Sequence, residues 1–373
     1  MDLGLNIHAL TKRSKPVRSK RVAYTILVLS LLCILIFIGD KRGANRRSVS
    51  VTHQQDLIAA PGGLGISLGL FASDPRWDYH ELIKEISGLG ASQILIVIPL
   101  HQESHTSISP TLNIPLEVLD KTIRQSQERG LQVSLMPIIK LNQRRMNLWR
   151  GVLDPEKPKV WWSNYRYELK RIARVAQRLG VVRLIIGSEL CSLEADLNHW
   201  GELIALLRAR FSGTLSYSAN WDHYQKIPFW TLLDEIAVTA YFPLRRQEET
   251  QNAWRKYLKE REIFASDHKR PLVISEYGYP ALDSALNQPW DETTNAPFNP
   301  SLQARLVGEA TRVILDRIAS QDPSLRAAFL WNWFGFGGQG DRGYTLRGRE
   351  GEQVLKQILE RSNPTPTQST LDE

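Results

Sequence analysis

Cysteine is scarce in this chain, and its scarcity excludes one way of holding a domain together. Only Cys33 and Cys191 occur in 373 residues, so the disulfide framework that stabilises many small secreted domains is excluded. The fold must therefore depend on a hydrophobic core, which about 280 residues of folded chain can supply. Glycosylation sites of the Asn-x-Ser/Thr type are absent too, because Asn299 and Asn363 are each followed by proline.

Net charge is missing from most of the chain. The whole sequence has 47 basic and 39 acidic residues and a formal charge of +8. Ten of the basic and two of the acidic residues lie in residues 1–47, so residues 48–373 contain 37 of each sign. The excess positive charge thus belongs to the N-terminal segment. The remainder gives no sign of binding a polyanion, and we expect no nucleic-acid partner.

Residues 22–39, VAYTILVLSLLCILIFIG, form an uncharged run of 18 residues, which is just long enough to span a bilayer. Basic residues are more numerous before this run than after it, so we expect a cytoplasmic N-terminus and an exported remainder, periplasmic or extracellular. A cleaved signal peptide is the alternative, but no A-x-A-like site follows the run. Processing as a lipoprotein is disfavoured because Leu32, rather than a small residue, precedes Cys33. The sequence predicts a basic cytoplasmic segment over 1–21, a transmembrane anchor over 22–39 and a linker over 40–63.

Strands and helices alternate from Gly65 onward, which indicates an α/β fold with a parallel sheet. We expect strands at 66–70, 94–98, 132–136, 184–187, 215–218, 236–240, 272–275 and 327–331. Amphipathic helices are clearest at 160–179 and 302–319. Eight units of about 35 residues are typical of a (β/α)8 TIM barrel. An open doubly wound sheet is disfavoured, because no Gly-rich phosphate turn follows the first strand. We expect the barrel over 64–361 and a disordered polar tail over 362–373.

Two glutamates stand at the ends of apolar strands. Glu189 ends Leu184-Ile-Ile-Gly-Ser-Glu, and Glu276 ends Leu272-Val-Ile-Ser-Glu. The C-terminal strand ends of a parallel barrel form the active site, and a charge buried there is costly unless it is paired or used. Two carboxylates at that position indicate glycoside hydrolysis: a separation of roughly 5–5.5 Å would make a retaining enzyme and roughly 6.5–9.5 Å an inverting one. The structural alternative is that each glutamate is paired with an arginine.

The other strand ends are rich in groups that suit a sugar. Asn220 and Trp221 follow the fifth expected strand, Tyr241 follows the sixth, and the eighth ends near Trp331 and Trp333. Aromatic rings pack on the apolar faces of pyranose rings, while amides and hydroxyls bind the sugar hydroxyls. We therefore expect these five residues to bind substrate, with Trp331 and Trp333 at the rim of the barrel.

Several segments resemble glycoside hydrolase family 113. They are Leu148-Trp-Arg-Gly, Gly187-Ser-Glu-Leu, Ser218-Ala-Asn-Trp-Asp, Val238-Thr-Ala-Tyr-Phe-Pro, Ser275-Glu-Tyr-Gly-Tyr-Pro and Pro289-Trp, and they occur in order over about residues 64–360. The resemblance implies a (β/α)8 barrel of the large retaining clan that acts on β-linked hexose polymers, with β-1,4-mannanase as the best known activity. It implies Glu189 as the acid/base, Glu276 as the nucleophile and Tyr241 as a residue that helps to keep Glu276 ionised.

The chain departs from the family pattern at three positions that face the expected site. Ile138 and Lys140 stand where the resemblance implies a polar segment, and Ser188 stands where the wider clan has asparagine. These changes leave the two glutamates in place and bear on the identity of the sugar.

Other interpretations of the site remain open. His101, Glu103 and His105 alternate after the second expected strand, but this spacing on a loop is weak evidence for a metal ion, and we expect neither a metal nor a cofactor. The barrel could bind polysaccharide without cleaving it, although the presence of both glutamates disfavours this. An enzyme tethered to the membrane could also transfer glycosyl groups and remodel an exported polysaccharide, since transglycosylation uses the same intermediate.

Overall fold

Within the residues described by the computed structural model, eight parallel strands close into a barrel. The strands are β1 (Gly63–Gly69), β2 (Gln93–Gln102), β4 (Gln132–Leu141), β5 (Arg183–Ser188), β6 (Thr214–Ala219), β7 (Ile236–Thr239), β8 (Leu272–Tyr277) and β9 (Leu325–Leu330). Each strand pairs with the next, and β1 pairs with both β2 and β9, which closes the sheet. The predicted TIM barrel is therefore confirmed.

The structure describes residues 60, 62–143, 148–244, 250–320 and 324–362. Every described residue belongs to one compact unit. The predicted anchor at 22–39 and nearly all of the predicted tail lie outside the described residues. None of the helices in the described part is long and apolar enough to cross a membrane.

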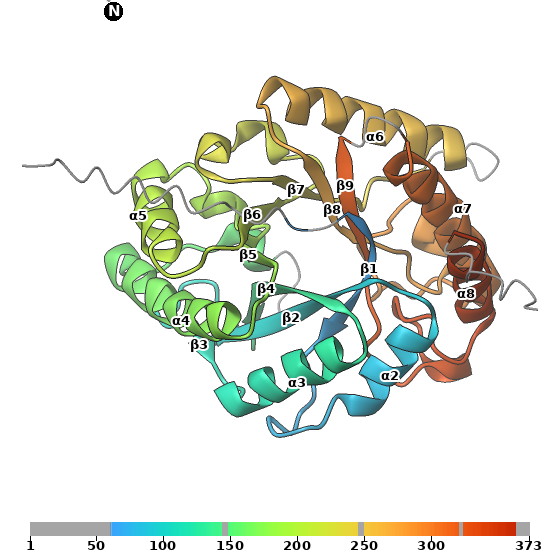
Figure 1. Cartoon of the computed structure of the whole chain (residues 1–373), viewed down its shortest axis with the longest axis horizontal. Coiled ribbons are helices and arrows are strands. Elements are labelled where there is room, and N and C mark those ends of the chain that lie inside the picture. Colours follow the sequence, from blue (N-terminus) through green and yellow to red (C-terminus); the bar gives the residue numbers. More distant parts are fainter. Residues whose placement is uncertain (1–59, 61, 144–147, 245–249, 321–323, 363–373) are drawn as a thin grey trace, which may run out of the picture. The chain divides into compact units, whose positions relative to one another are not determined.

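Helices surround the barrel (Figure 1). They are α2 (His80–Gly88), α3 (Leu116–Glu128), α4 (Pro158–Arg178), α5 (Leu197–Arg208), α6 (Thr250–Asp267), α7 (Pro300–Ile318) and α8 (Glu350–Ser362). The connection from β6 to β7 contains only the short 3-10 turns at Tyr224–Lys226 and Trp230–Leu232. Helix α7 begins at Pro300, two residues before the expected start, because the Asn299 side chain accepts a hydrogen bond from the Leu302 amide and proline occupies the first turn.

The core has two layers, as the double-sided burial of parallel strands requires. Side chains inside the barrel form one apolar cluster, made of Leu95, Val97, Met136, Ile138, Ile185, Ala237, Val273, Ala327 and Phe329. A larger cluster lies between the strands and the helices. Gly187 has no side chain in this outer layer, since a Cβ there would approach the Tyr165 hydroxyl to 2.9 Å.

A buried ion pair lies at the N-terminal ends of the strands. Arg183, the first residue of β5, is fully buried and donates to both carboxylate oxygens of Glu235, at 2.7 and 3.1 Å. It also donates to the Ser134 hydroxyl at 3.1 Å. The N-terminal end of the barrel is therefore filled by an ion pair with hydrogen-bond partners, whereas the two candidate catalytic glutamates lie at the C-terminal end.

Two features differ from the sequence prediction. A short strand, β3 (Thr111–Leu112), pairs antiparallel with the end of β2; two residues give no detectable alternation, so the sequence contained no signal for it. The expected linker also ends too late. Ala60 is fully buried, and its amide donates to the Thr214 hydroxyl at 3.0 Å, so the chain already packs on the barrel before β1 begins at Gly63.

Candidate active site

Glu189 follows β5 directly, at the C-terminal end of the barrel. Its backbone has a φ of 53°, in the left-handed region that non-glycine residues rarely adopt, and its amide donates to the Ser218 carbonyl at 2.8 Å. The Thr239 hydroxyl donates to its Oε1 at 3.0 Å. Glu189 is only 6% exposed, so its unusual backbone turns a carboxylate into the mouth of the barrel instead of toward solvent.

Glu276 lies within β8 and is almost completely buried. The Tyr241 hydroxyl donates to its Oε2 at 3.0 Å and the Ser188 hydroxyl to its Oε1 at 3.2 Å. Burial and the charge of Glu276 raise the pKa of Tyr241 well above its usual value, so the phenol stays protonated and remains a donor. Tyr241 thus lies beside Glu276, as the resemblance implied.

Arg150 connects the two carboxyl groups electrostatically. Its Nη2 donates to Glu189 Oε2 at 2.5 Å, and the charges of both Glu189 and Glu276 help to raise its pKa. The alternative that a strand-end glutamate pairs with an arginine is therefore correct for Glu189, while Glu276 is held by hydroxyl groups. Arg150 comes from the 3-10 turn Arg150–Val152 after β4.

The pKa of Glu276 differs from the sequence-based expectation. Burial, and next to it the charge of Glu189, raise this pKa to about 7, and Arg150, Tyr241 and Ser188 oppose the shift. The resemblance implied an ionised Glu276, whereas a pKa of about 7 leaves this carboxyl group partly protonated at neutral pH. Two carboxyl groups that interact in this way titrate as a pair.

Aromatic and cationic side chains gather at the C-terminal ends of the strands, the end of the barrel that carries the two glutamates. Trp331, directly after β9, is partly exposed and packs with its ring centroid 6.3 Å from that of Phe71. The Lys140 ammonium group lies 5.3 Å from the centroid of the Phe71 ring. The ring of Tyr344 packs edge-on against Tyr241, with 5.8 Å between their centroids. Lys140, one of the positions where this chain departs from the family pattern, is thus at the same end of the barrel as the site.

Asn220 and Trp221 follow β6 on the side of Glu189. The Trp221 amide donates to the Thr239 hydroxyl, which itself donates to Glu189. The Trp221 ring is stacked with that of Trp290, with 6.4 Å between centroids and 16° between planes. Trp290 is half exposed, and the side-chain oxygen of Asn220 is buried without a hydrogen-bond partner. Both features are what a sugar-binding surface needs: an aromatic face and a free acceptor.

Trp333 does not lie at the rim, and this part of the expected site is wrong. The side chain is completely buried in the outer core, and its Nε1 donates to Glu85 at 2.8 Å. Both tryptophans follow the end of β9 at Leu330, so their nearness to the strand end does not place both side chains at the rim.

Sequence analysis missed three contacts of the glutamates. Arg150 and Ser188 belong to motifs that were recognised, but neither had been given a partner, and Thr239 was not singled out. The weak metal hypothesis at His101, Glu103 and His105 is not supported by the arrangement, since in the described residues the one group of potential metal ligands is Cys191, Glu194 and His223. His101 and Glu103 instead contact the side chain of Asn142.

Comparisons with known proteins agree with this geometry. Two solved structures of family 113 enzymes are similar over nearly their whole length. The β-mannanase of Alicyclobacillus acidocaldarius, solved in complex with ManMIm, is 20% identical with a TM-score of 0.66, and the alignment covers 82% of this chain and 99% of that chain. A β-1,4-mannanase is 19% identical with a TM-score of 0.67, covering 81% and 98%. A family 5 mannosidase from Rhizomucor miehei is 12% identical with a TM-score of 0.56, covering 82% and 93%.

No curated protein sequence matches the chain. The model of Glycoside Hydrolase Family 113 matches residues 81–336, a range that contains every strand from β2 to β9 and both strand-end glutamates. That range is more than half of the chain, and the fold and the site geometry agree with it. The chain belongs to glycoside hydrolase family 113 and is a glycoside hydrolase.

Proposed function

We propose that the enzyme is a retaining β-glycosidase that cleaves a β-1,4-linked hexose polysaccharide of the mannan type, with Glu276 as nucleophile and Glu189 as acid/base. The observation that carries this assignment is the Tyr241 hydroxyl, which donates to Glu276 Oε2 as the resemblance to family 113 implies for the nucleophile. The Ser188 hydroxyl donates to the other carboxylate oxygen of Glu276. Glu189 is held by Thr239 and by an arginine on a turn. The similarity to β-mannanase structures supports the substrate class.

The reaction follows from these positions. In the first step a carboxylate oxygen of Glu276 forms a bond to the anomeric carbon. The bond from that carbon to the glycosidic oxygen breaks, and this oxygen takes the proton of Glu189. In the second step Glu189 accepts a proton from water, which attacks the same carbon and releases Glu276. Glu276 loses its negative charge in the first step, so the Tyr241 and Ser188 hydroxyls that stabilise the ionised group must reorient or weaken there.

The resting contact of Arg150 has a consequence for the first step. The Arg150 guanidinium donates to Glu189 Oε2 and so occupies an oxygen that the acid/base needs for the leaving group. Bound substrate must therefore bring the glycosidic oxygen to Glu189 in place of the arginine. Burial raises the pKa of Glu276 to about 7, so Glu276 must give up its proton before its carboxylate attacks.

The test compares variants on two kinds of substrate. Glu276→Gln is expected to abolish release of reducing ends from β-1,4-mannan. Glu189→Ala is expected to lose activity on mannan but keep much of the first step on aryl β-glycosides, whose leaving groups need no proton. Glu168→Gln is the matched control, because Glu168 is also buried and paired with an arginine, Arg171, but lies on α4. Equal loss on both substrates in Glu189→Ala would refute the acid/base assignment.

The panel of substrates should also contain β-glucan and chitosan, because Ile138 and Lys140 border the site. Release of reducing ends from another polymer alone would change the substrate class and leave the mechanism intact. Binding of mannan without cleavage by the wild-type chain would instead favour a binding barrel.

We place the barrel outside the cytoplasm, tethered by residues 22–39. The uncharged run of 18 residues and its basic N-terminal flank support this arrangement. Full-length protein is expected in the membrane fraction after a high-salt wash, with the barrel digested by protease added from outside the cytoplasmic membrane. Recovery in the soluble fraction would refute the tether.

A further inference from the structure

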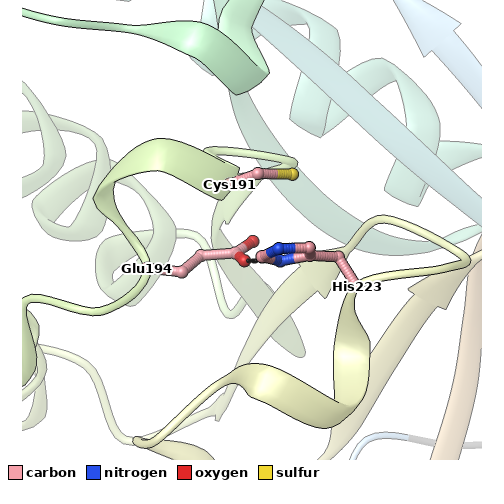
Figure 2. A group of neighbouring side chains, drawn as sticks. All are labelled: Cys191, Glu194 and His223. Atoms are coloured by element: carbon pink, nitrogen blue, oxygen red, sulfur yellow. Dashed lines mark hydrogen bonds and ion pairs between the residues drawn. The ribbon is translucent and has the colours of Figure 1, made fainter.

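Cys191, Glu194 and His223 lie together beside the active site (Figure 2). Cys191 and Glu194 come from the turn that follows Glu189, and His223 comes from the loop after β6. One ligand atom from each of the three side chains lies within 4.8 Å of the other two. None of the three contacts the nucleophile, and the proposed reaction does not use them.

The three side chains offer one sulfur, one nitrogen and one oxygen donor. A thiol, an imidazole and a carboxylate are the three ligand types that Zn²⁺ binds in proteins, and three protein ligands with one open position is a common arrangement. Cys191 and His223 are partly exposed and Glu194 is buried, so water could complete the shell from the open side. The Tyr217 hydroxyl donates to Glu194 Oε1 at 2.6 Å, which orients the carboxylate and leaves Oε2 toward the other two groups.

The local charge also favours a cation. The carboxyl groups of Glu194, Glu189 and Asp222 lie close enough to act electrostatically on the Cys191 thiol. A divalent cation among these groups would offset their mutual repulsion.

We propose that Cys191, Glu194 and His223 bind a divalent transition-metal ion, with Zn²⁺ as the best chemical match. The thiol gives up its proton to solvent on binding. His223 Nδ1 and Glu194 Oε2 are 2.6 Å apart in a hydrogen bond, and this separation lengthens to about 3.3 Å when both atoms bind one tetrahedral ion at about 2.0–2.1 Å. A small rotation of the exposed imidazole provides that change.

The test measures binding without any use of activity. The full-length chain, purified in detergent and freed of metal with a chelator, is titrated with Co²⁺ and then with Zn²⁺. We expect a thiolate-to-cobalt charge-transfer band at one equivalent, which Zn²⁺ removes. Cys191→Ser is expected to abolish the band, and His223→Gln to weaken Zn²⁺ binding at least about tenfold. Cys33→Ser is the matched control for cysteine, and His268→Gln for histidine; both are expected to bind as the wild type does.

Several outcomes would overturn the proposal. The wild type could show no charge-transfer band, or the band could persist in Cys191→Ser, which would place the bound metal elsewhere. Circular dichroism shows whether Cys191→Ser, a change of one atom, keeps the fold. If it does not, His223→Gln on the exposed side decides the question. Binding of Zn²⁺ by a chain that fails to cleave any glycan would refute the proposed function and leave this site intact.

Discussion

Replacing Arg150 by glutamine is expected to move both limbs of the pH–rate profile to higher pH. The reaction on mannan needs one proton on the pair Glu189–Glu276, so kcat/KM should be bell-shaped, and its limbs report the two pKa values of the pair. Arg150 stabilises ionised carboxylates: it donates to Glu189 at 2.5 Å and its charge lowers the pKa of Glu276. Removing Arg150 therefore raises both pKa values of the pair.

The size of the shift follows from the contact. An opposite charge within about 4–6 Å lowers a carboxyl pKa by about 1–3. The Arg150 side chain is 21% exposed, so solvent screens part of its charge and the lower end of that range applies. We expect each limb to move up by about one pH unit, equivalent to about 1.4 kcal/mol. At a fixed pH on the acid limb, kcat/KM should fall about tenfold.

Two control variants make this result specific. Arg150→Lys keeps a positive charge and is expected to leave the limbs close to their wild-type positions. Arg171→Gln removes an arginine of similar exposure from another buried glutamate, Glu168, on α4, and should not shift either limb. Limbs that stay in place or move to lower pH in Arg150→Gln would refute the electrostatic reasoning, as would an equal shift in Arg171→Gln.

Three further predictions concern stability and binding. Because folding raises the pKa of Glu276 from 4.5 to about 7, the stability due to its protonated form is present below about pH 4.5 and is lost as pH rises through 7. Urea denaturation should therefore show Glu276→Gln more stable than the wild type at pH 8, by up to about 3 kcal/mol, and less different at pH 5; a difference independent of pH would contradict this. Arg183→Met should lower the free energy of unfolding by about 3–5 kcal/mol, because it leaves Glu235 buried and unpaired; a loss below about 1 kcal/mol would show that the pair is not needed. Trp331→Ala should lower kcat/KM on mannan roughly thirtyfold, equivalent to about 2 kcal/mol, through lost contact with a sugar ring, and an unchanged value would remove Trp331 from the binding surface.

The barrel could be predicted from the sequence because its signals are repeated. Each strand is a run of branched apolar residues followed by a polar one, and eight such runs at regular spacing leave few alternatives. The same repetition identified Glu189 and Glu276, since each interrupts the apolar pattern at the end of a strand. Predicted strand boundaries were within a few residues of the observed ones, except that β2 and β4 continue to Gln102 and Leu141.

The partners of the glutamates could not be predicted in the same way. Arg150 lies on a turn after β4, 39 residues before Glu189, and no periodicity relates positions in different loops. Trp333, in contrast, was assigned to the site and does not belong to it. Its neighbour Trp331 borders the site, but a change of backbone direction beyond Leu330 sends Trp333 into the outer core against Glu85. Local pattern predicts which face of a regular strand a residue occupies, and it stops doing so where the strand ends.

Ser188 shows how a departure from the family pattern can still support the reaction. Its hydroxyl donates to Glu276 Oε1 at 3.2 Å and lies 3.3 Å from the Ser218 hydroxyl, which is 2.7 Å from the hydroxyl of Ser275. These serines connect β5, β6 and β8 beneath the two carboxyl groups. A hydroxyl group can rotate between donor and acceptor roles, whereas the two ends of an asparagine amide have fixed roles. The chain of serines can therefore donate to Glu276 while it is ionised and turn away when the glycosyl ester forms. Serine at this position thus holds the nucleophile while it is ionised and releases it when the ester forms.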